Sequence, residues 1–217
     1  MFKNKVFRYS TLAMLLAIVA YFLIETFSPP KKAPGIVSNE ELNPATYAEL
    51  IQDDRKDLEK WFRTSDESPI EDQAAFKGLD YYAPDIDFRV VAKLVPYQGE
   101  DKILEIHNTD GSVDPYERYA FLHFELGGSP QKLLLLKHEG VFSLMWKDGT
   151  SGKTTYGGGR YLDFTAADIK SNQLVVDFNK AYSPYCAYNH QYACPLPPAE
   201  NTLTVSVAAG EKFTAEK

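Results

Sequence analysis

Side chains able to do chemistry are concentrated in residues 147–201 of this chain. Arg160 follows three consecutive glycines, and Asp177 and Glu200 lie further along the same stretch. An arginine can hold a carboxylate or phosphate through two parallel hydrogen bonds, and a carboxylate can act as a general base. One hypothesis is therefore a hydrolase without a standard motif, in which Arg160 holds an anionic group and Asp177 or Glu200 is the base.

The three glycines before Arg160 invite comparison with phosphate-binding loops. Such loops are followed by the start of a helix, whereas residues 161–164 have a pattern typical of a strand. Glycines also permit positive φ or the close approach of another backbone segment, so we expect a structural role for them. For Arg160 an internal ion pair is favoured over a ligand carboxylate. Its candidate partners are Asp148, Asp163 and Asp177.

Cys186 and Cys194 are the only two cysteines of the chain. In an exported protein the pair is expected to form a disulfide, which would stabilise the loop between them by about 2–3 kcal/mol. Three other interpretations stay open: two free buried cysteines, a metal site that adds His190, and a catalytic pair of Cys186 and His190. Structural zinc sites need four ligands, and no fourth lies nearby, so we predict no metal and no cofactor.

Tyrosines surround these cysteines, and their rings and hydroxyls suit carbohydrate or peptide binding. They are Tyr182, Tyr185, Tyr188 and Tyr192. A structural role is the favoured alternative, because an irregular loop must bury something to stay ordered. If a ligand binds, we expect its site to be lined by Tyr156, Arg160, Asn179, Tyr182 and Tyr188.

The elements that position these residues are predicted to be mainly strands. Short runs rich in Val, Leu and aromatic residues alternate with turn residues, which is typical of an antiparallel meander. A strand is also favoured over a helix turn for the apolar run Leu133–Leu136. The predicted strands cover residues 87–97, 102–107, 116–126, 132–138, 141–146, 161–164, 174–178 and 203–209.

Two helices are predicted before the strands. Asn43 and Pro44 form a good helix start, and apolar residues then recur at helical spacing as far as Phe62. A second, short helix is indicated by a capping box at 68–71 and by Gly78 after it. The expected fold is α+β, mainly β: an antiparallel sandwich or partly open barrel with two helices packed on it.

The amino terminus predicts a membrane anchor. Basic residues precede an apolar run over residues 9–27, which as a helix would span about 28 Å, close to the hydrocarbon thickness of a bilayer. A cleaved signal is the alternative, but no small-residue cleavage site follows. We expect an anchor over 1–27, a Pro/Lys-rich spacer over 28–42 and a single domain over 43–217. The protein would cross the inner membrane once, with this domain outside the cytoplasm.

The chain from residue 36 onward, which includes the predicted domain, is strongly negative in charge. Five basic residues and one acidic residue precede position 36, and removing them from the 23 and 30 of the whole chain leaves a net charge of −11. Such a domain repels nucleic acid, so we exclude DNA and RNA as partners. The expected partners are the membrane, through the N-terminal helix, and a small or envelope-derived ligand. The oligomeric state is not predicted.

Several motifs lie along the chain: Asp148-x-Thr150-x-Gly152, Thr155–Leu162, Asp177-Phe178-Asn179-x-Ala181-Tyr182-x-Pro184-x-Cys186-Ala187-Tyr188, Cys194-Pro195-Leu196-Pro197-Pro198-x-Glu200-Asn201 and Ala209–Lys212, with Ser68-Pro69 and Phe76-x-Gly78-Leu79 upstream. Together they resemble one bacterial and archaeal family, the domain of unknown function 1684. The resemblance implies no reaction, cofactor or catalytic residue. In the family's pattern the position of His190 is not a fixed histidine, which argues against the metal site.

The leading functional hypothesis is a membrane-tethered, exported binding module. Its glycine loop and tyrosine loop would lie side by side and form the recognition surface. The alternatives are the hydrolase described above and a structural or interaction domain without a ligand, which would have no deep pocket.

Overall fold

The computed structural model describes residues 36–213, and within this range the chain is mainly β. The predicted anchor at 1–27 and the spacer up to Gly35 lie outside the described residues. Between Ile36 and Phe213, no helix is long and apolar enough to cross a membrane. The end of the predicted spacer contacts the domain, because the Asn39 side chain donates to the carbonyl of Ile86 at 3.0 Å.

Seven strands form one antiparallel sheet in the order β7-β6-β5-β4-β2-β8, with β3 also paired with β4, and β1 and β9 form a separate pair. The strands are β1 (Asp80–Tyr81), β2 (Arg89–Pro96), β3 (Ile103–His107), β4 (Val113–Leu126), β5 (Ser129–His138), β6 (Val141–Trp146), β7 (Arg160–Phe164), β8 (Gln173–Asp177) and β9 (Glu211–Lys212). The main strands are therefore in one sheet, and the sandwich alternative is wrong.

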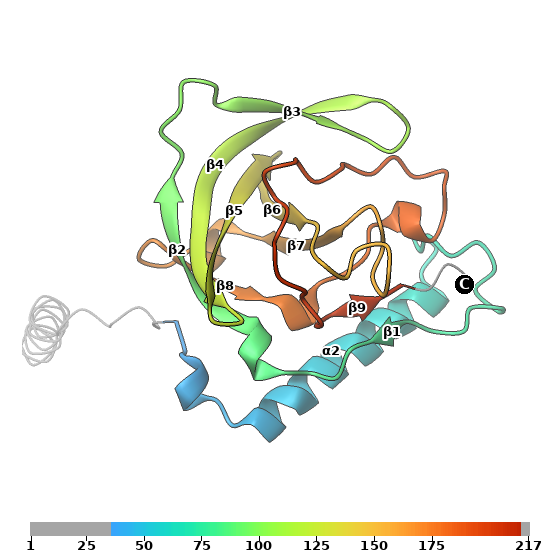
Figure 1. Ribbon diagram of the computed structural model, residues 1–217. Helices are drawn as coiled ribbons and strands as arrows, with labels where there is room; N and C mark the ends of the chain where they lie inside the picture. Colours follow the sequence, from blue (N-terminus) through green and yellow to red (C-terminus); the bar gives the residue numbers. More distant parts are fainter. Residues whose placement is uncertain (1–35, 214–217) are drawn as a thin grey trace, which may run out of the picture. The chain divides into compact units, whose positions relative to one another are not determined.

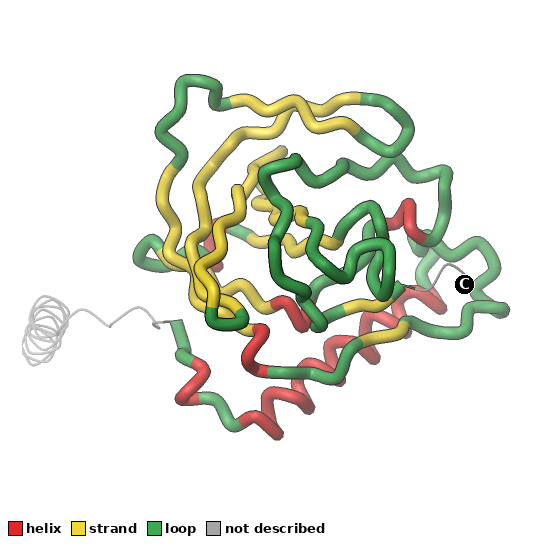
Figure 2. Tube along the Cα trace, in the orientation of Figure 1, coloured by secondary structure: helices red, strands yellow, loops and turns green. Residues whose placement is uncertain are grey.

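The sheet curls into half of a barrel, as Figures 1 and 2 show. Its longest strand, β4, pairs with β3 through its first residues and with β2 through its later ones. A shift of register between Arg118 and Ala120 marks a bulge on the β5 side of this strand. Bulges bend a strand and increase its twist, which allows one strand to serve neighbours that point in different directions.

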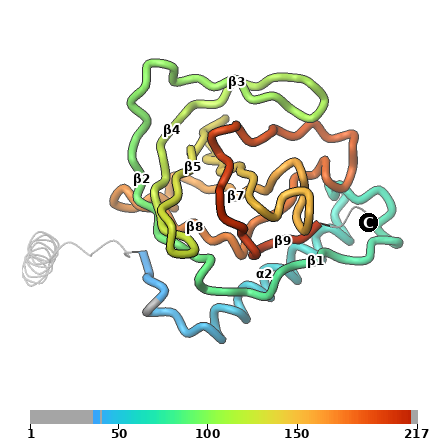
Figure 3. The backbone as a smooth tube through the Cα atoms, viewed as in Figure 1, coloured from blue at the N-terminus to red at the C-terminus, as the bar shows by residue number. Residues whose placement is uncertain are grey.

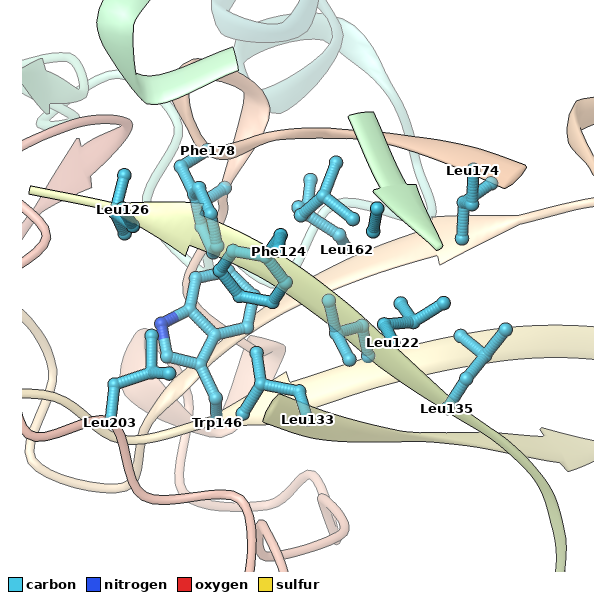
Figure 4. Packing of buried hydrophobic residues seen from close by; sticks show 14 of the residues in the cluster. Leu122, Phe124, Leu126, Leu133, Leu135, Trp146, Leu162, Leu174, Phe178 and Leu203 are labelled. Atoms are coloured by element: carbon cyan, nitrogen blue, oxygen red, sulfur yellow. The ribbon is translucent and has the colours of Figure 1, made fainter. Parts of the chain in front are cut away.

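Both faces of the sheet are covered, and each has its own apolar cluster. Leu133 and Leu135 belong to one cluster, whereas Leu134 and Leu136 belong to the other. This placement confirms that the run is a strand, because successive side chains of a strand point to opposite faces. The larger cluster is built around Trp146, whose ring meets that of Phe178 edge to face with centroids 5.2 Å apart (Figure 4).

The one α-helix of the described residues is α2 (Pro44–Thr64). Asn43 caps it as predicted, and its side-chain oxygen accepts hydrogen bonds from the backbone N–H groups of Ala45 and Thr46. The helix packs on the chain that leaves β8, because the Tyr47 hydroxyl donates to Asp177 at 2.8 Å. Short 3₁₀ turns complete the set: η1 (Asn39–Glu41), η2 (Ile86–Phe88), η3 (Ala166–Asp168), η4 (Phe178–Lys180) and η5 (Tyr185–Ala187).

The second predicted helix is absent from the described residues, which follow a series of turns from Ser65 to Gly78. Ser68 does not cap a helix; its hydroxyl donates back to the carbonyl of Phe62 at 2.7 Å. Asp72 accepts from the backbone N–H groups of Ala74 and Ala75. These side chains supply hydrogen-bond partners to nearby backbone groups, so a short segment gains few additional hydrogen bonds by forming a helix.

The predicted strand over 203–209 is also wrong. Alternate residues of this segment, Leu203, Val207 and Ala209, are buried in the larger cluster, so the apolar alternation indicated correctly which side chains point inward. The backbone nevertheless pairs with no neighbouring strand over most of its length. For the end of the segment, the side chain of Arg160 takes the place of a neighbouring strand, because it donates hydrogen bonds to the carbonyls of Val207 and Ala209.

Candidate functional site

Arg160 begins β7, and its side chain is fully buried in an ion pair. Its Nη2 lies 2.9 Å from Oδ2 of Asp148, and the two side chains are 0% and 1% exposed. The same nitrogen donates to the carbonyl of Val207 at 2.8 Å, and Nη1 donates to the carbonyl of Ala209. The guanidinium therefore takes the place of a neighbouring strand for residues 207–209, whereas Leu203 and Val205 make backbone hydrogen bonds with Lys147 and Gly149. The structure confirms an internal ion pair and identifies Asp148 as the partner.

The glycines before Arg160 allow two loops to approach closely. Gly159 has φ +104°, and a Cβ at this position would lie 2.6 Å from both Pro197 Cγ and the carbonyl oxygen of Trp146. The following residues form β7 instead of a helix, as predicted. Figure 3 shows the 147–160 loop beside the C-terminal segment, and the bridge between Lys147 and Thr202 joins them. The Tyr156 hydroxyl lies 3.7 Å from Sγ of Cys186, so the glycine loop also lies beside the tyrosine loop.

Cys186 and Cys194 are both free and buried, so the predicted disulfide is not formed in this structure. The backbone N–H of Cys186 instead donates to Sγ of Cys194 at 3.1 Å, and the Tyr156 hydroxyl lies 3.7 Å from Sγ of Cys186. The hydrogen bond from the Cys194 thiol lowers the pKa of Cys186 to about 6, and the same bond raises the pKa of Cys194. Cys186 is therefore the more acidic of the two thiols.

His190 does not join the cysteines. Its side chain is exposed and lines a groove of about 510 Å³ with Ile70, Phe76 and Tyr188. Among residues 36–213, no group of three or more His, Cys, Asp or Glu side chains is placed to hold a metal ion.

Asp177 and Asn179 fasten α2 to the end of β8. Asn179 donates to the Tyr47 hydroxyl at 2.8 Å, and that hydroxyl donates to both oxygens of Asp177. Burial, then the charge of Asp177, raises the pKa of Tyr47, so Tyr47 stays protonated and remains a donor. These contacts give Asp177 and Asn179 a positioning role between helix and sheet.

The three residues of the hydrolase hypothesis make separate sets of contacts. Arg160 is bound to Asp148, and Asp177 is bound to Tyr47. Glu200 is exposed, and its carboxylate lies 4.0 Å from Nε of Arg118. No cavity described for residues 36–213 is lined by Arg160 together with either carboxylate. A base next to a bound anion, which that mechanism needs, is therefore not formed.

A large aromatic pocket lies between α2, β7 and the loop after β8. Its volume is about 530 Å³, within the range of about 300–1,000 Å³ typical of small-molecule sites. We call it the aromatic pocket. Its lining residues are Leu58, Trp61 and Phe62 from α2, Tyr161 and Asp163 from β7, Lys180, Tyr182, Ser183, Pro184, Tyr185, Tyr192, Ala193 and Cys194 from the loop, and Glu211 from β9.

The hydroxyls of two lining tyrosines are held by the protein. Tyr182 donates to Oδ2 of Asp163, and Tyr161 donates to the carbonyl of Pro195. Burial raises the pKa of both tyrosines, and for Tyr182 the charge of Asp163 raises it further. Both rings therefore stay neutral. Reciprocal backbone hydrogen bonds of 3.0 and 3.2 Å between Tyr161 and Tyr182 fix the positions of their rings.

Comparison with known proteins places this domain in a family. The family model described as "Protein of unknown function (DUF1684)" matches residues 74–212. The chain belongs to the DUF1684 family. An uncharacterized protein of Haloarcula marismortui, solved in solution by NMR, is similar to this chain with 30% sequence identity and a TM-score of 0.61. The match covers 80% of this chain and 97% of that one. The search of curated proteins found no match.

The structure of this DUF1684 protein brings together few of the residues predicted to bind a ligand. Tyr182 lines the aromatic pocket, whereas Asn179 lines a neighbouring cavity of about 140 Å³ and Tyr188 lines the groove beside His190. Arg160 is enclosed by protein, and the Tyr156 ring packs edge to face on Phe213 with centroids 5.1 Å apart. The predicted recognition surface around Arg160 is therefore a structural core.

Three of the four candidate tyrosines, Tyr182, Tyr185 and Tyr192, line the aromatic pocket of this DUF1684 domain, but sequence reasoning missed the contribution of α2 and β7. Trp61 was assigned only to the apolar face of a helix, and Asp163 only to a possible ion pair with Arg160. The sequence does contain a signal for Trp61. A large aromatic residue next to Phe62 makes the apolar face of the helix wider than packing against one sheet requires. Nothing local indicated that this face meets the tyrosine loop.

Proposed function

We propose that this DUF1684 domain is a binding module for a small molecule and that the aromatic pocket is its site. The observation that carries the proposal is a cavity of about 530 Å³ lined by aromatic rings from α2, β7 and the loop after β8. Ligand sites are typically concave and mostly apolar, with a few polar groups that orient the ligand. Here those groups are Asp163, Lys180, Ser183 and Glu211. A purely structural domain has no need of such a pocket.

The cellular setting is part of the same proposal. The basic and apolar pattern of residues 1–27 supports an uncleaved anchor in the inner membrane, with the domain outside the cytoplasm. The ligand would then be a small molecule of the cell envelope or its surroundings. The negative charge of the domain supports the absence of nucleic acid among its partners.

A thermal-shift screen of the full-length chain tests the proposal. The chain, purified in a nonionic detergent, is heated with envelope glycans, lipid headgroups and small amphipathic molecules of each charge. A ligand present at 100 times its Kd stabilises the folded state by about 2.7 kcal/mol, which gives a measurable rise in melting temperature. We expect a rise with at least one ligand class in the wild type and a smaller rise in Trp61→Ala.

Tyr97→Leu is the matched control for that variant. Tyr97 is a half-buried aromatic residue that packs on Phe121 with ring centroids 5.8 Å apart and is not part of the aromatic pocket. Its substitution should leave the ligand-induced rise intact. A ligand that stabilises Trp61→Ala as much as the wild type would place binding outside the aromatic pocket and overturn the proposal.

A further inference from the structure

We infer that the aromatic pocket selects an organic cation, an ammonium group carried by a molecule that also has a hydroxyl. This inference rests on the proposed function and adds the chemical class of the ligand. Three features of the pocket lead to it: the arrangement of its aromatic faces, its balance of charge and one buried hydroxyl without a partner.

The aromatic rings that line the pocket lie at different angles to one another. Trp61 and Tyr185 are stacked, with centroids 6.2 Å apart and planes at 20°. Tyr185 and Tyr192 are nearly perpendicular at 81°, with centroids 5.3 Å apart. The faces of aromatic rings carry negative electrostatic potential, and pockets built from several such rings bind ammonium ions through cation–π contacts.

The charge of the lining favours the same class of ligand. Asp163 accepts a hydrogen bond from Ser143 at 2.6 Å and another from Tyr182, and both donors are neutral. Its carboxylate has further acceptor sites, and it makes no ion pair within residues 36–213. It is exposed, so a ligand can reach it.

The remaining charged residues do not reverse this balance. Lys180 is the one cation in the described lining, and its Nζ lies 2.7 Å from Oδ2 of Asp54, with the lysine side chain 53% exposed. Glu211 adds a second carboxylate, which accepts from the backbone N–H of Ser183 at 3.1 Å and from the Tyr188 hydroxyl. An anionic ligand would therefore meet the carboxylate of Asp163 and the negative faces of the rings, whereas Lys180 is already paired with Asp54.

The Ser183 hydroxyl indicates a second feature of the ligand. Ser183 is 1% exposed, and its Oγ has no hydrogen-bond partner in the described part of the chain. The residue belongs to the lining of the aromatic pocket. A buried hydroxyl without a partner costs about 1–3 kcal/mol, and a polar atom of a bound ligand would remove that cost. A hydroxyl next to an ammonium group, as in choline, supplies both contacts.

Isothermal titration of the full-length chain with matched probes tests the inference. Choline is compared with dimethylbutanol, its neutral carbon isostere, and with dimethylbutyrate, an anion of similar size. We expect choline to bind at least about tenfold more tightly than either, since cation–π and carboxylate contacts act only on the cation. Equal or tighter binding of the neutral or anionic probe would overturn the inference and leave the proposed function standing. Binding of none of the three would overturn the inference, whereas the proposed function fails only if the wider screen is also blank.

Asp163→Asn provides an independent measurement. We expect it to weaken choline binding about tenfold and to leave dimethylbutanol unaffected, because only the cation responds to the lost charge. Asp101→Asn is the matched control, since Asp101 is another exposed carboxylate that accepts from a tyrosine, Tyr97, at 2.6 Å. Unchanged choline affinity in Asp163→Asn would contradict the inference. The probe comparison on the wild type needs no variant and stands if Asp163→Asn does not fold.

Discussion

Nη2 of Arg160 lies 2.9 Å from Oδ2 of Asp148, and neither side chain is more than 1% exposed. Asp148 is itself held by its neighbours, because its Oδ1 accepts from the hydroxyl of Thr150 at 2.6 Å and from the backbone N–H of Val207 at 3.2 Å. The pair thus joins the start of β7 to the C-terminal segment. The ion pair therefore stabilises the fold, and its removal should lower the unfolding free energy.

Replacing Arg160 with Met should strongly destabilise the domain. Asp148 would remain buried without its cation, and such broken pairs cost about 3–5 kcal/mol of unfolding free energy. Urea denaturation followed by circular dichroism measures the loss. Lys56→Met is the control, because the ion pair of Lys56 with Asp53 is exposed and worth at most about 1 kcal/mol. A loss for Arg160→Met as small as the control's would show that the pair does not stabilise the fold.

Replacing Asn201 with Ala should destabilise the domain through the strands that Asn201 connects. Its side chain accepts from the backbone N–H of Leu134 at 2.7 Å and donates to the carbonyls of Leu134 and Met145, both at 2.8 Å. Buried backbone groups that lose their partners cost about 1–3 kcal/mol each, so for three such groups we expect a total loss of about 3 kcal/mol or more in urea denaturation. A change below about 1 kcal/mol would mean that water or a neighbouring residue replaces the amide.

The paired cysteines should make stability depend on pH. The hydrogen bond from Cys194 lowers the pKa of Cys186 from its ordinary value of 9.0 to about 6. Between these pH values the Cys186 thiol is protonated in the unfolded chain and ionised in the folded one. The unfolding free energy should therefore rise with pH over this range, and the stability contributed by Cys186 should be lost as the pH falls through about 6. Above about pH 9 the raised pKa of Cys194 should reverse the trend.

Cys186→Ser isolates that effect. Serine cannot ionise in this range, so the variant should lose the rise in unfolding free energy between about pH 6 and pH 9. Urea denaturation at a series of pH values measures the difference between wild type and variant. The same slope in both proteins would show that other groups cause the pH dependence.

Replacing Tyr185 with Leu should weaken ligand binding without unfolding the protein. The ring stacks on Trp61 at one side of the aromatic pocket and is partly exposed. Loss of one aromatic face should raise the Kd for choline about tenfold, measured by isothermal titration. Tyr97→Leu should leave that Kd unchanged. Equal affinities of the two variants would remove Tyr185 from the site.

The strands could be predicted well because turn residues and apolar runs are local signals. Each predicted strand between residues 87 and 178 is present. The 203–209 segment shows the limit of this reasoning. Its alternation is real, but alternation reports only which side chains are buried. It does not predict that the guanidinium of Arg160 donates hydrogen bonds to the carbonyls of Val207 and Ala209, which a neighbouring strand would otherwise do.

The site was harder to predict because its residues come from three separate elements. The tyrosine-rich loop was identified as a candidate surface, and its Tyr182, Tyr185 and Tyr192 do line the aromatic pocket. Arg160 was the natural centre of a ligand site, since its chemistry is the same whether the partner is a ligand or Asp148. Only the packing of α2 against the loop places Trp61 beside Tyr185.

Tryptophan fluorescence tests the central claim most directly, because the chain has two tryptophans in different settings. Trp61 lines the aromatic pocket, whereas Trp146 is 0% exposed in the core. A ligand that raises the melting temperature is titrated into the full-length chain and into Trp61→Phe, which keeps Trp146. The account predicts a saturable change in emission for the wild type and none for the variant. A stabilising ligand that leaves the emission of the wild type unchanged, or that changes both proteins equally, would contradict it.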